Sequence, residues 1–184
     1  WQAEACDGPV TVSYEVYAWD LSVRSAHVDQ THAFFNGSSV FLEAVGLENR
    51  PHIVDIKKPD SPDAHTWRVI TALPEHKASR YGFGTYMAKD YDELIDSPVE
   101  MGNFILGQFE ACGVPHEIAI TGKVPNLDLK RIEDDLRKIC ETEITLFEPE
   151  TRKAPVSRYV FFVMVVKNGY GGLEHRASTA LLCS

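Results

Sequence analysis

One short stretch near the end of the chain carries residue types that could hold a peptide. Residues 168–175 read Asn-Gly-Tyr-Gly-Gly-Leu-Glu-His, so paired glycines precede a carboxylate and an imidazole. Glycines within a strand often mark a place where another backbone comes close. A peptide could add there as an extra strand, held by main-chain hydrogen bonds. Glu174 would then be a fixed negative charge suited to a free ammonium group, with Tyr170 over the ligand.

The same stretch is also compatible with a simpler structure. Gly-rich segments commonly form hairpins, and this one would lead into an ordinary amphipathic edge strand. Tyr170 would then be an aromatic residue of the rim or of the core. The local sequence leaves both interpretations open.

Other patterns of catalytic or metal-binding residues are missing from the sequence. His116-Glu117 begins like the H-E-x-x-H zinc motif, but residue 120 is isoleucine and the segment predicts a strand. The seven histidines contain no i, i+4 pair, so each is interpreted as a surface or core residue rather than a ligand. The cysteines are too widely spaced to favour a zinc site; they are Cys6, Cys112, Cys140 and Cys183.

The composition indicates an ordinary folded chain with an acidic surface. Of its 184 residues, 44% are hydrophobic and 24% are charged, which is enough to bury a normal core. Lys plus Arg number 18 against 27 Asp plus Glu, a formal charge of -9 that argues against a nucleic-acid-binding surface. No apolar run approaches the length of a membrane span. We therefore expect neither nucleic acid nor membrane as a partner.

The first half of the sequence predicts short antiparallel strands. Residues 9–19 alternate apolar and polar types, as is typical of a half-buried strand. Asn36-Gly37 predicts a hairpin turn, because both residues tolerate positive φ. Further strands are expected at residues 39–45, 52–56, 66–70 and 79–88. Their spacing predicts an antiparallel β-sandwich.

The pattern changes after residues 91–95, which predict a short helical turn with Asp90 as its N-cap. Acidic residues cluster here and fit either a solvated turn or a cation site; they are Asp92, Glu93, Asp96 and Glu100. We place a domain boundary between residues 97 and 98.

The second half predicts a sheet that carries one helix. Strands are expected at residues 103–111 and 116–122. An apolar stripe at three- and four-residue steps predicts a helix from Asn126 or Asp128 to Phe147. The apolar run at 159–166 predicts a fully buried strand just before the glycines. A sheet that carries a helix indicates an α+β or α/β domain.

Two motifs together give the chain a family resemblance. Residues 94–102, Leu-Ile-Asp-Ser-Pro-Val-Glu-Met-Gly, and residues 170–175, Tyr-Gly-Gly-Leu-Glu-His, resemble the glycyl aminopeptidase family. Its members are zinc metallopeptidases of the gluzincin type, often with a PDZ domain near the C-terminus. Residues 17–24, 35–37 and 67–69 also follow in the order of that family's N-terminal region. The resemblance spans nearly the whole chain.

The resemblance implies a mainly β fold with an α+β part. Residues 1–97 would form the N-terminal antiparallel β-sandwich. Residues 98–184 would form the opening sheet and helix of a thermolysin-like catalytic domain, without its zinc motif.

The resemblance also assigns roles to the Gly-Gly-Leu-Glu-His strand. It is similar to the Gly-x-Met-Glu-Asn strand of the broader aminopeptidase superfamily, whose backbone pairs with substrate. By position, Gly171, Gly172 and Leu173 would supply main-chain contacts, and Glu174 would hold the substrate's free amine. His175 replaces the superfamily's Asn.

One part of the family pattern is absent from the sequence. Family members bind zinc through an H-E-x-x-H helix and a further glutamate, and neither is present here. Catalytic zinc needs three protein ligands and an open position. We therefore expect the N-terminal fragment of a longer zinc aminopeptidase, inactive alone, with no catalytic residue and no zinc of its own. Its substrates would be peptides with N-terminal Gly or Ala, and its partners its own missing catalytic and PDZ regions.

A rival hypothesis is a non-catalytic β-sandwich binding module in which the motif is coincidental. An H-E-x-x-H motif in the coding sequence beyond Ser184 would favour the peptidase. The sequence is compatible with a cytoplasmic or a bacterial periplasmic location.

Overall fold

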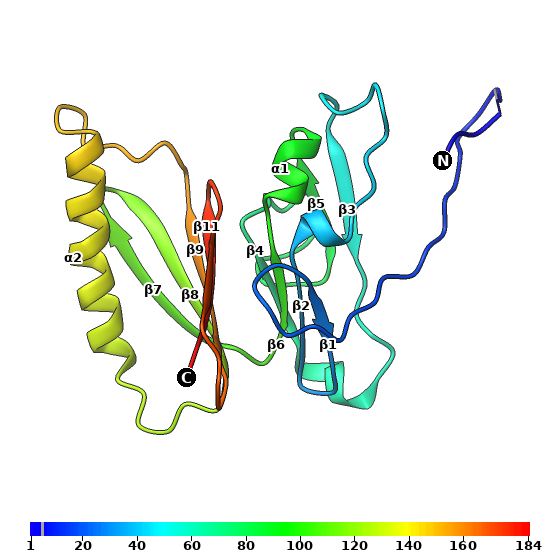
Figure 1. Cartoon of the computed structure of the whole chain (residues 1–184). Helices are drawn as coiled ribbons and strands as arrows, with labels where there is room; N and C mark the ends of the chain where they lie inside the picture. The colour runs from blue at the N-terminus through cyan, green and yellow to red at the C-terminus, as the bar shows by residue number, and fades with distance from the viewer. Residues whose placement is uncertain (5) are drawn as a thin grey trace.

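The computed structural model describes residues 1–4 and 6–184 and contains three β-sheets and one long helix (Figure 1). In Figure 1 the long helix stands at one side, a five-stranded sheet lies against it, and the smaller sheets lie beyond that sheet. An extended N-terminal segment runs along the outside. Among the described residues, no helix has both the length and the apolar character that a bilayer crossing requires.

The N-terminal part is built from two antiparallel sheets that pack face to face. One has the order β1-β2-β6-β4 and the other pairs β3 with β5. Their bounds are β1 Ala26–Val28, β2 His32–Phe35, β3 His52–Ile56, β4 Arg68–Thr71, β5 Gly84–Ala88 and β6 Val99–Gly102. Ile56, Val69, Tyr86 and Val99 lie between the sheets and are at most 7% exposed. The predicted antiparallel β-sandwich is confirmed.

The C-terminal part is a five-stranded mixed sheet with the order β10-β11-β9-β8-β7. Its strands are β7 Ile105–Ala111, β8 Val114–Gly122, β9 Tyr159–Val165, β10 Gly171–Glu174 and β11 Ser178–Cys183. The central strand β9 is parallel to both β8 and β11, whereas the outer pairs are antiparallel. A sheet that carries a helix agrees with the α+β part of the prediction.

The helices begin where the sequence predicts. In α1, Tyr91–Ile95, the Asp90 carboxylate accepts a hydrogen bond from the Glu93 N–H at 2.7 Å. In α2, Leu129–Phe147, Asp128 caps the Arg131 N–H at 3.0 Å. Such caps satisfy N–H groups that have no partner within the helix. Two short 3-10 turns, η1 at Gly37–Ser39 and η2 at Pro62–Thr66, complete the elements.

The strand predicted at residues 9–19 is wrong. The segment forms only an isolated bridge between Trp19 and His27, and its apolar side chains face solvent. Val12 is 62% exposed and Tyr17 is 76% exposed. Alternation gives a segment one apolar face, but a strand also needs a neighbour with free N–H and C=O groups. In the described structure only Ala18 and Trp19, at the end of this segment, have such a neighbour, which is β1.

Two further expectations need correction. Asn36 has φ -87°, and its side chain caps the 3-10 turn at Ser38 N instead of forming a hairpin, so residues 39–45 are not a strand. Side chains of Asn often compete in this way for backbone donors. Strand β9 is not fully buried: Val160 and Phe162 are at most 3% exposed, but the residues facing α2 are partly exposed. The helix packs chiefly on β7 and leaves that face of β9 incompletely covered.

The β-sandwich and the five-stranded sheet share an apolar core. Phe34 on β2 meets Phe162 on β9 edge-to-face, with ring centroids 6.2 Å apart. Val160 and Ala180, from β9 and β11, are at most 1% exposed and pack in the same cluster. Alternate residues of β9 and β11 therefore face the sandwich.

A buried carboxylate adds a polar connection between these parts. The Glu117 side chain on β8 is only 4% exposed and is paired with the Arg80 guanidinium. The Tyr81 hydroxyl donates to Glu117 Oε1 at 2.6 Å, and Arg158 Nη1 lies 3.5 Å from Glu117 Oε2. Arg158 also donates to the Thr71 carbonyl at 2.7 Å. Residues of both parts therefore converge on a single negative charge.

We expect Glu117→Gln to lower the free energy of unfolding by about 3–5 kcal/mol, because removing one partner leaves buried charge uncompensated. Urea denaturation measures the change. The control is Asp134→Asn, which removes an exposed helical pair with Lys130 at 2.8 Å and should leave stability almost unchanged. Equal stability of the two variants would contradict the central role of Glu117.

Candidate functional site

The predicted peptide-binding stretch forms an edge strand. Strand β10 pairs antiparallel with β11, with Gly171 opposite Leu182 and Glu174 opposite Thr179. β10 is the terminal strand of its sheet, so within the described structure its other edge has no strand beside it. Its outward N–H and C=O groups are therefore available to another extended chain.

Packing does not require the paired glycines of β10. A Cβ added to Gly171 would come no closer than 3.7 Å to Val23, and one added to Gly172 would lie 3.5 Å from Leu181. Both distances are ordinary van der Waals contacts. The glycines thus leave bare backbone along an accessible edge instead of filling a tight place in the core.

Glu174 lies at a cavity between β10 and the β-sandwich. The cavity has a volume of about 310 Å³ and is lined by Asn36, Ser38, Asp92, Ile95, Asp96, Leu173, Glu174, His175 and Arg176. Glu174 is exposed, and its carboxylate has no hydrogen bond or ion pair with any described residue. Three carboxylates against one guanidinium give the lining a negative balance. Such a lining suits a cationic group.

The acidic residues of this region also affect the pKa of a neighbouring tyrosine. Burial raises the pKa of Tyr159 to about 12, and nearby groups that include Asp96 and Glu174 add to the shift. A negative charge near a phenol disfavours its ionised form. Tyr159 is therefore neutral at physiological pH and can act only as a hydrogen-bonding or packing group.

His175 points inward and ties β10 to α1. Its Nδ1 lies 3.0 Å from Asp96 Oδ1, and its side chain is only 5% exposed. The Arg176 N–H donates to the other oxygen of Asp96 at 2.9 Å. One carboxylate thus holds the two residues that follow the edge strand.

The six predicted residues have different environments. Leu173, Glu174 and His175 line the cavity, and Leu173 also packs against the core. Tyr170 is 96% exposed, so it belongs neither to the core nor to the cavity lining. The glycines lie along the edge.

Sequence reasoning missed the contribution of the β-sandwich to this cavity. Asn36 and Ser38, at the 3-10 turn, and Ile95, at the end of α1, form one side of it. The sequence places Asp96 in an acidic cluster and in the motif at residues 94–102, but not beside the glycine strand. The sequence does contain one indication that Asp96 and His175 belong together. The motifs that contain them, at residues 94–102 and 170–175, both carry the family resemblance.

His116 and Glu117 are not placed as ligands of a catalytic zinc ion. His116 stacks on Phe109 with ring centroids 4.9 Å apart, and burial lowers its pKa. Glu117 is held in the arginine network described above. Both lie on β8, where Ile120 stands at the position of the second histidine. The H-E-x-x-H chemistry is not available to this chain.

Comparison with known proteins identifies the family. Residues 1–103, more than half of the 184, match the Peptidase M61 N-terminal domain. The chain belongs to the Peptidase M61 N-terminal domain family. A search of curated proteins found no match.

Solved structures extend the likeness of this M61 chain to its C-terminal sheet. It is similar to an aminopeptidase N family protein from Idiomarina loihiensis, with 45% identity over 91% of this chain and a TM-score of 0.84. An M1 zinc metallopeptidase from Deinococcus radiodurans shares the fold at 12% identity over 91% of the chain, with TM-score 0.52. Yeast LTA4 hydrolase also shares the fold, at 14% identity over 82% of the chain, with a TM-score of 0.51. The M61 chain spans only 27%, 39% and 23% of these proteins, respectively.

We expect Asp96→Ala to loosen β10, because it removes the acceptor for both His175 and Arg176. Hydrogen bonds to charged groups contribute about 1.5–3 kcal/mol, so the free energy of unfolding should fall by a similar amount. Amide exchange of Leu173 and Glu174 should accelerate. Both quantities are accessible by urea denaturation and hydrogen-exchange mass spectrometry.

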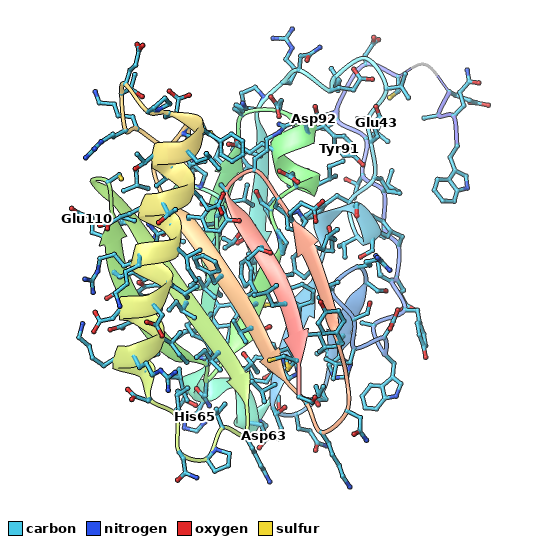
Figure 2. The ribbon with its side chains drawn as sticks, turned by 60° about the vertical axis from the view of Figure 1, so that its left-hand side comes forward. Glu43, Asp63, His65, Tyr91, Asp92 and Glu110 are labelled. Atoms are coloured by element: carbon cyan, nitrogen blue, oxygen red, sulfur yellow. The ribbon has the colours of Figure 1, made fainter. Side chains whose placement is uncertain are left out.

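The matched control is Asp92→Ala on the same helix. Figure 2 labels Asp92 on α1, where its 71%-exposed side chain lies 3.5 Å from Arg176. Such a surface pair contributes little to stability. If both variants had the same effect, the tethering role of Asp96 would be wrong.

Proposed function

We propose that this chain is the N-terminal portion of a zinc-dependent aminopeptidase of the glycyl aminopeptidase type. The longer protein would release N-terminal Gly or Ala from peptides. This portion would align the substrate. The observation that carries the proposal is a glycine-rich edge strand with an unpaired carboxylate, Glu174, at its end.

The edge strand β10 supplies what an extended peptide needs. Main-chain hydrogen bonds along Gly171 and Gly172 would bind any sequence, because they do not involve side chains. The absence of side chains at these two positions lets the peptide backbone approach closely. Leu173 packs against the apolar core.

Glu174 would determine which end of the peptide is bound. Its carboxylate has no competing partner among the described residues, so a substrate ammonium group would be its first close cation. Hydrogen bonds between oppositely charged groups are shorter and stronger than neutral ones. A peptide with a blocked N-terminus would leave the carboxylate without that partner. This preference is the property expected of an aminopeptidase.

The catalytic zinc of the proposed enzyme would bind outside this chain. Zinc lowers the pKa of a bound water to about 7 and so provides a nucleophile at neutral pH. The residues here contribute no ligand to it. Their part is to bind and orient the peptide for the proposed catalytic region, which a PDZ domain would follow.

We expect Glu174→Gln in the longer protein to lower kcat/KM for a glycyl or alanyl chromogenic amide by about 10- to 100-fold. The estimate follows from the loss of about 1.5–3 kcal/mol from one charged hydrogen bond. Inhibition by glycinamide, which keeps the free amine, should weaken by a similar factor. Steady-state kinetics measures both.

The control is Glu110→Gln at the opposite edge of the same sheet. Figure 2 labels Glu110 on β7, on the far side of the sheet from β10. It is exposed, and its substitution should leave both constants unchanged. Normal turnover by Glu174→Gln would exclude the amine-binding role. A longer protein without any amidase activity would instead favour the non-catalytic binding module.

A further inference from the structure

A second group of polar side chains lies at the turn between β1 and β2. His27 Nε2 is 3.3 Å from Asp29 Oδ2. His32 lies beside them, with its ring centroid 5.2 Å from that of His27. One ligand atom from each of the three residues can be chosen so that all lie within 4.8 Å of one another. His27 and His32 are 7% and 5% exposed.

The turn itself holds Asp29 in place through Oδ1, while Oδ2 contacts His27. Asp29 Oδ1 accepts hydrogen bonds from the Thr31 N–H at 2.7 Å, the Thr31 hydroxyl at 2.7 Å and the His32 N–H at 3.1 Å. These hydrogen bonds fix the carboxylate, and Oδ2 has His27 Nε2 as its described partner.

His32 has an outer partner of the kind that accompanies metal-binding histidines. Its Nδ1 lies 3.2 Å from Oε1 of Glu100, whose side chain is 4% exposed. This is an ion-pair distance without the angles of a hydrogen bond. The Thr121 hydroxyl donates to the same oxygen at 2.9 Å. Metal-binding histidines almost always direct their second nitrogen at a carboxylate, carbonyl or water, which fixes the ring. With Nδ1 against Glu100, Nε2 is the nitrogen of His32 left for a ligand.

We propose that His27, Asp29 and His32 bind a Zn²⁺ ion at the β1–β2 turn. Two imidazoles and one carboxylate are a ligand set that zinc accepts, with a fourth position for water. Imidazole ligands favour zinc and its transition-metal neighbours over Mg²⁺ or Ca²⁺. A hollow of about 490 Å³, lined by Trp19, Val28, Asp29, Gln30 and Thr31, borders the site on its Asp29 side.

This site is distinct from the proposed catalytic zinc and does not depend on the proposed function. It lies on the β-sandwich, whereas the candidate peptide-binding edge belongs to the five-stranded sheet. The competing explanation is two separate ion pairs, His27 with Asp29 and His32 with Glu100. In that case the two imidazoles would be protonated and would bind no metal. Two adjacent imidazolium ions would repel each other, whereas one divalent ion could bind both neutral rings.

The test is calorimetric titration of the 184-residue chain with Zn²⁺, in a Cys6→Ser background that removes the exposed thiol. The chain lacks H-E-x-x-H, so no catalytic site competes. We expect one Zn²⁺ per chain. Asp29→Asn should lower the association constant at least about 10-fold, since even the loss of an outer partner commonly costs that much. The asparagine keeps an oxygen for the turn, and far-UV circular dichroism checks the fold.

The matched control is His76→Ala, which removes an exposed histidine outside the group and should leave binding unchanged. A second measurement needs no variant: zinc should shift the imidazole nitrogen resonances of His27 and His32 but not those of exposed His65 and His76. No saturable binding, equal affinity in Asp29→Asn, or equal shifts of all these histidines would overturn the proposal. The ion-pair explanation would then hold.

Discussion

The buried carboxylate of Glu117 is the constraint on which the arrangement of the two parts depends. A charge that is 4% exposed is costly unless it is paired, and its partners Arg80 and Arg158 come from both sides of the junction. Apolar packing between β2 and β9 could tolerate small sliding movements. The ion pairs and the Tyr81 hydroxyl require one relative position. The distance between the β-sandwich and the edge strand is therefore fixed by residues that do not line the cavity.

The candidate site uses that fixed position. Glu174 belongs to the five-stranded sheet, but the opposite side of its cavity comes from η1 and α1 of the β-sandwich. Asp96 connects the two by accepting from both His175 and the Arg176 backbone. A peptide bound along β10 would meet residues from both parts. This composite arrangement explains why neither half of the sequence, taken alone, indicates a complete site.

The sequence predicted the features that depend on neighbouring residues. The caps Asp90 and Asp128, the amphipathic pattern of α2 and the apolar run of β9 each have a local physical cause, and each element is found. The strand predicted at residues 9–19 was wrong because an alternating pattern does not indicate whether a partner strand lies beside the segment. The inward turn of His175 and the grouping of His27 with His32 depend on long-range placement. Spacing along the chain does not contain that information.

The parallel pairing of β9 also determines when the sheet can be completed during synthesis. Its partner β11 follows it by way of the β10 hairpin, so the second edge of β9 stays open until Cys183 has left the ribosome. An open, apolar strand edge is a template for pairing with other chains. Nascent chains paused before Ser178 would therefore expose this edge of β9 to pairing with other chains.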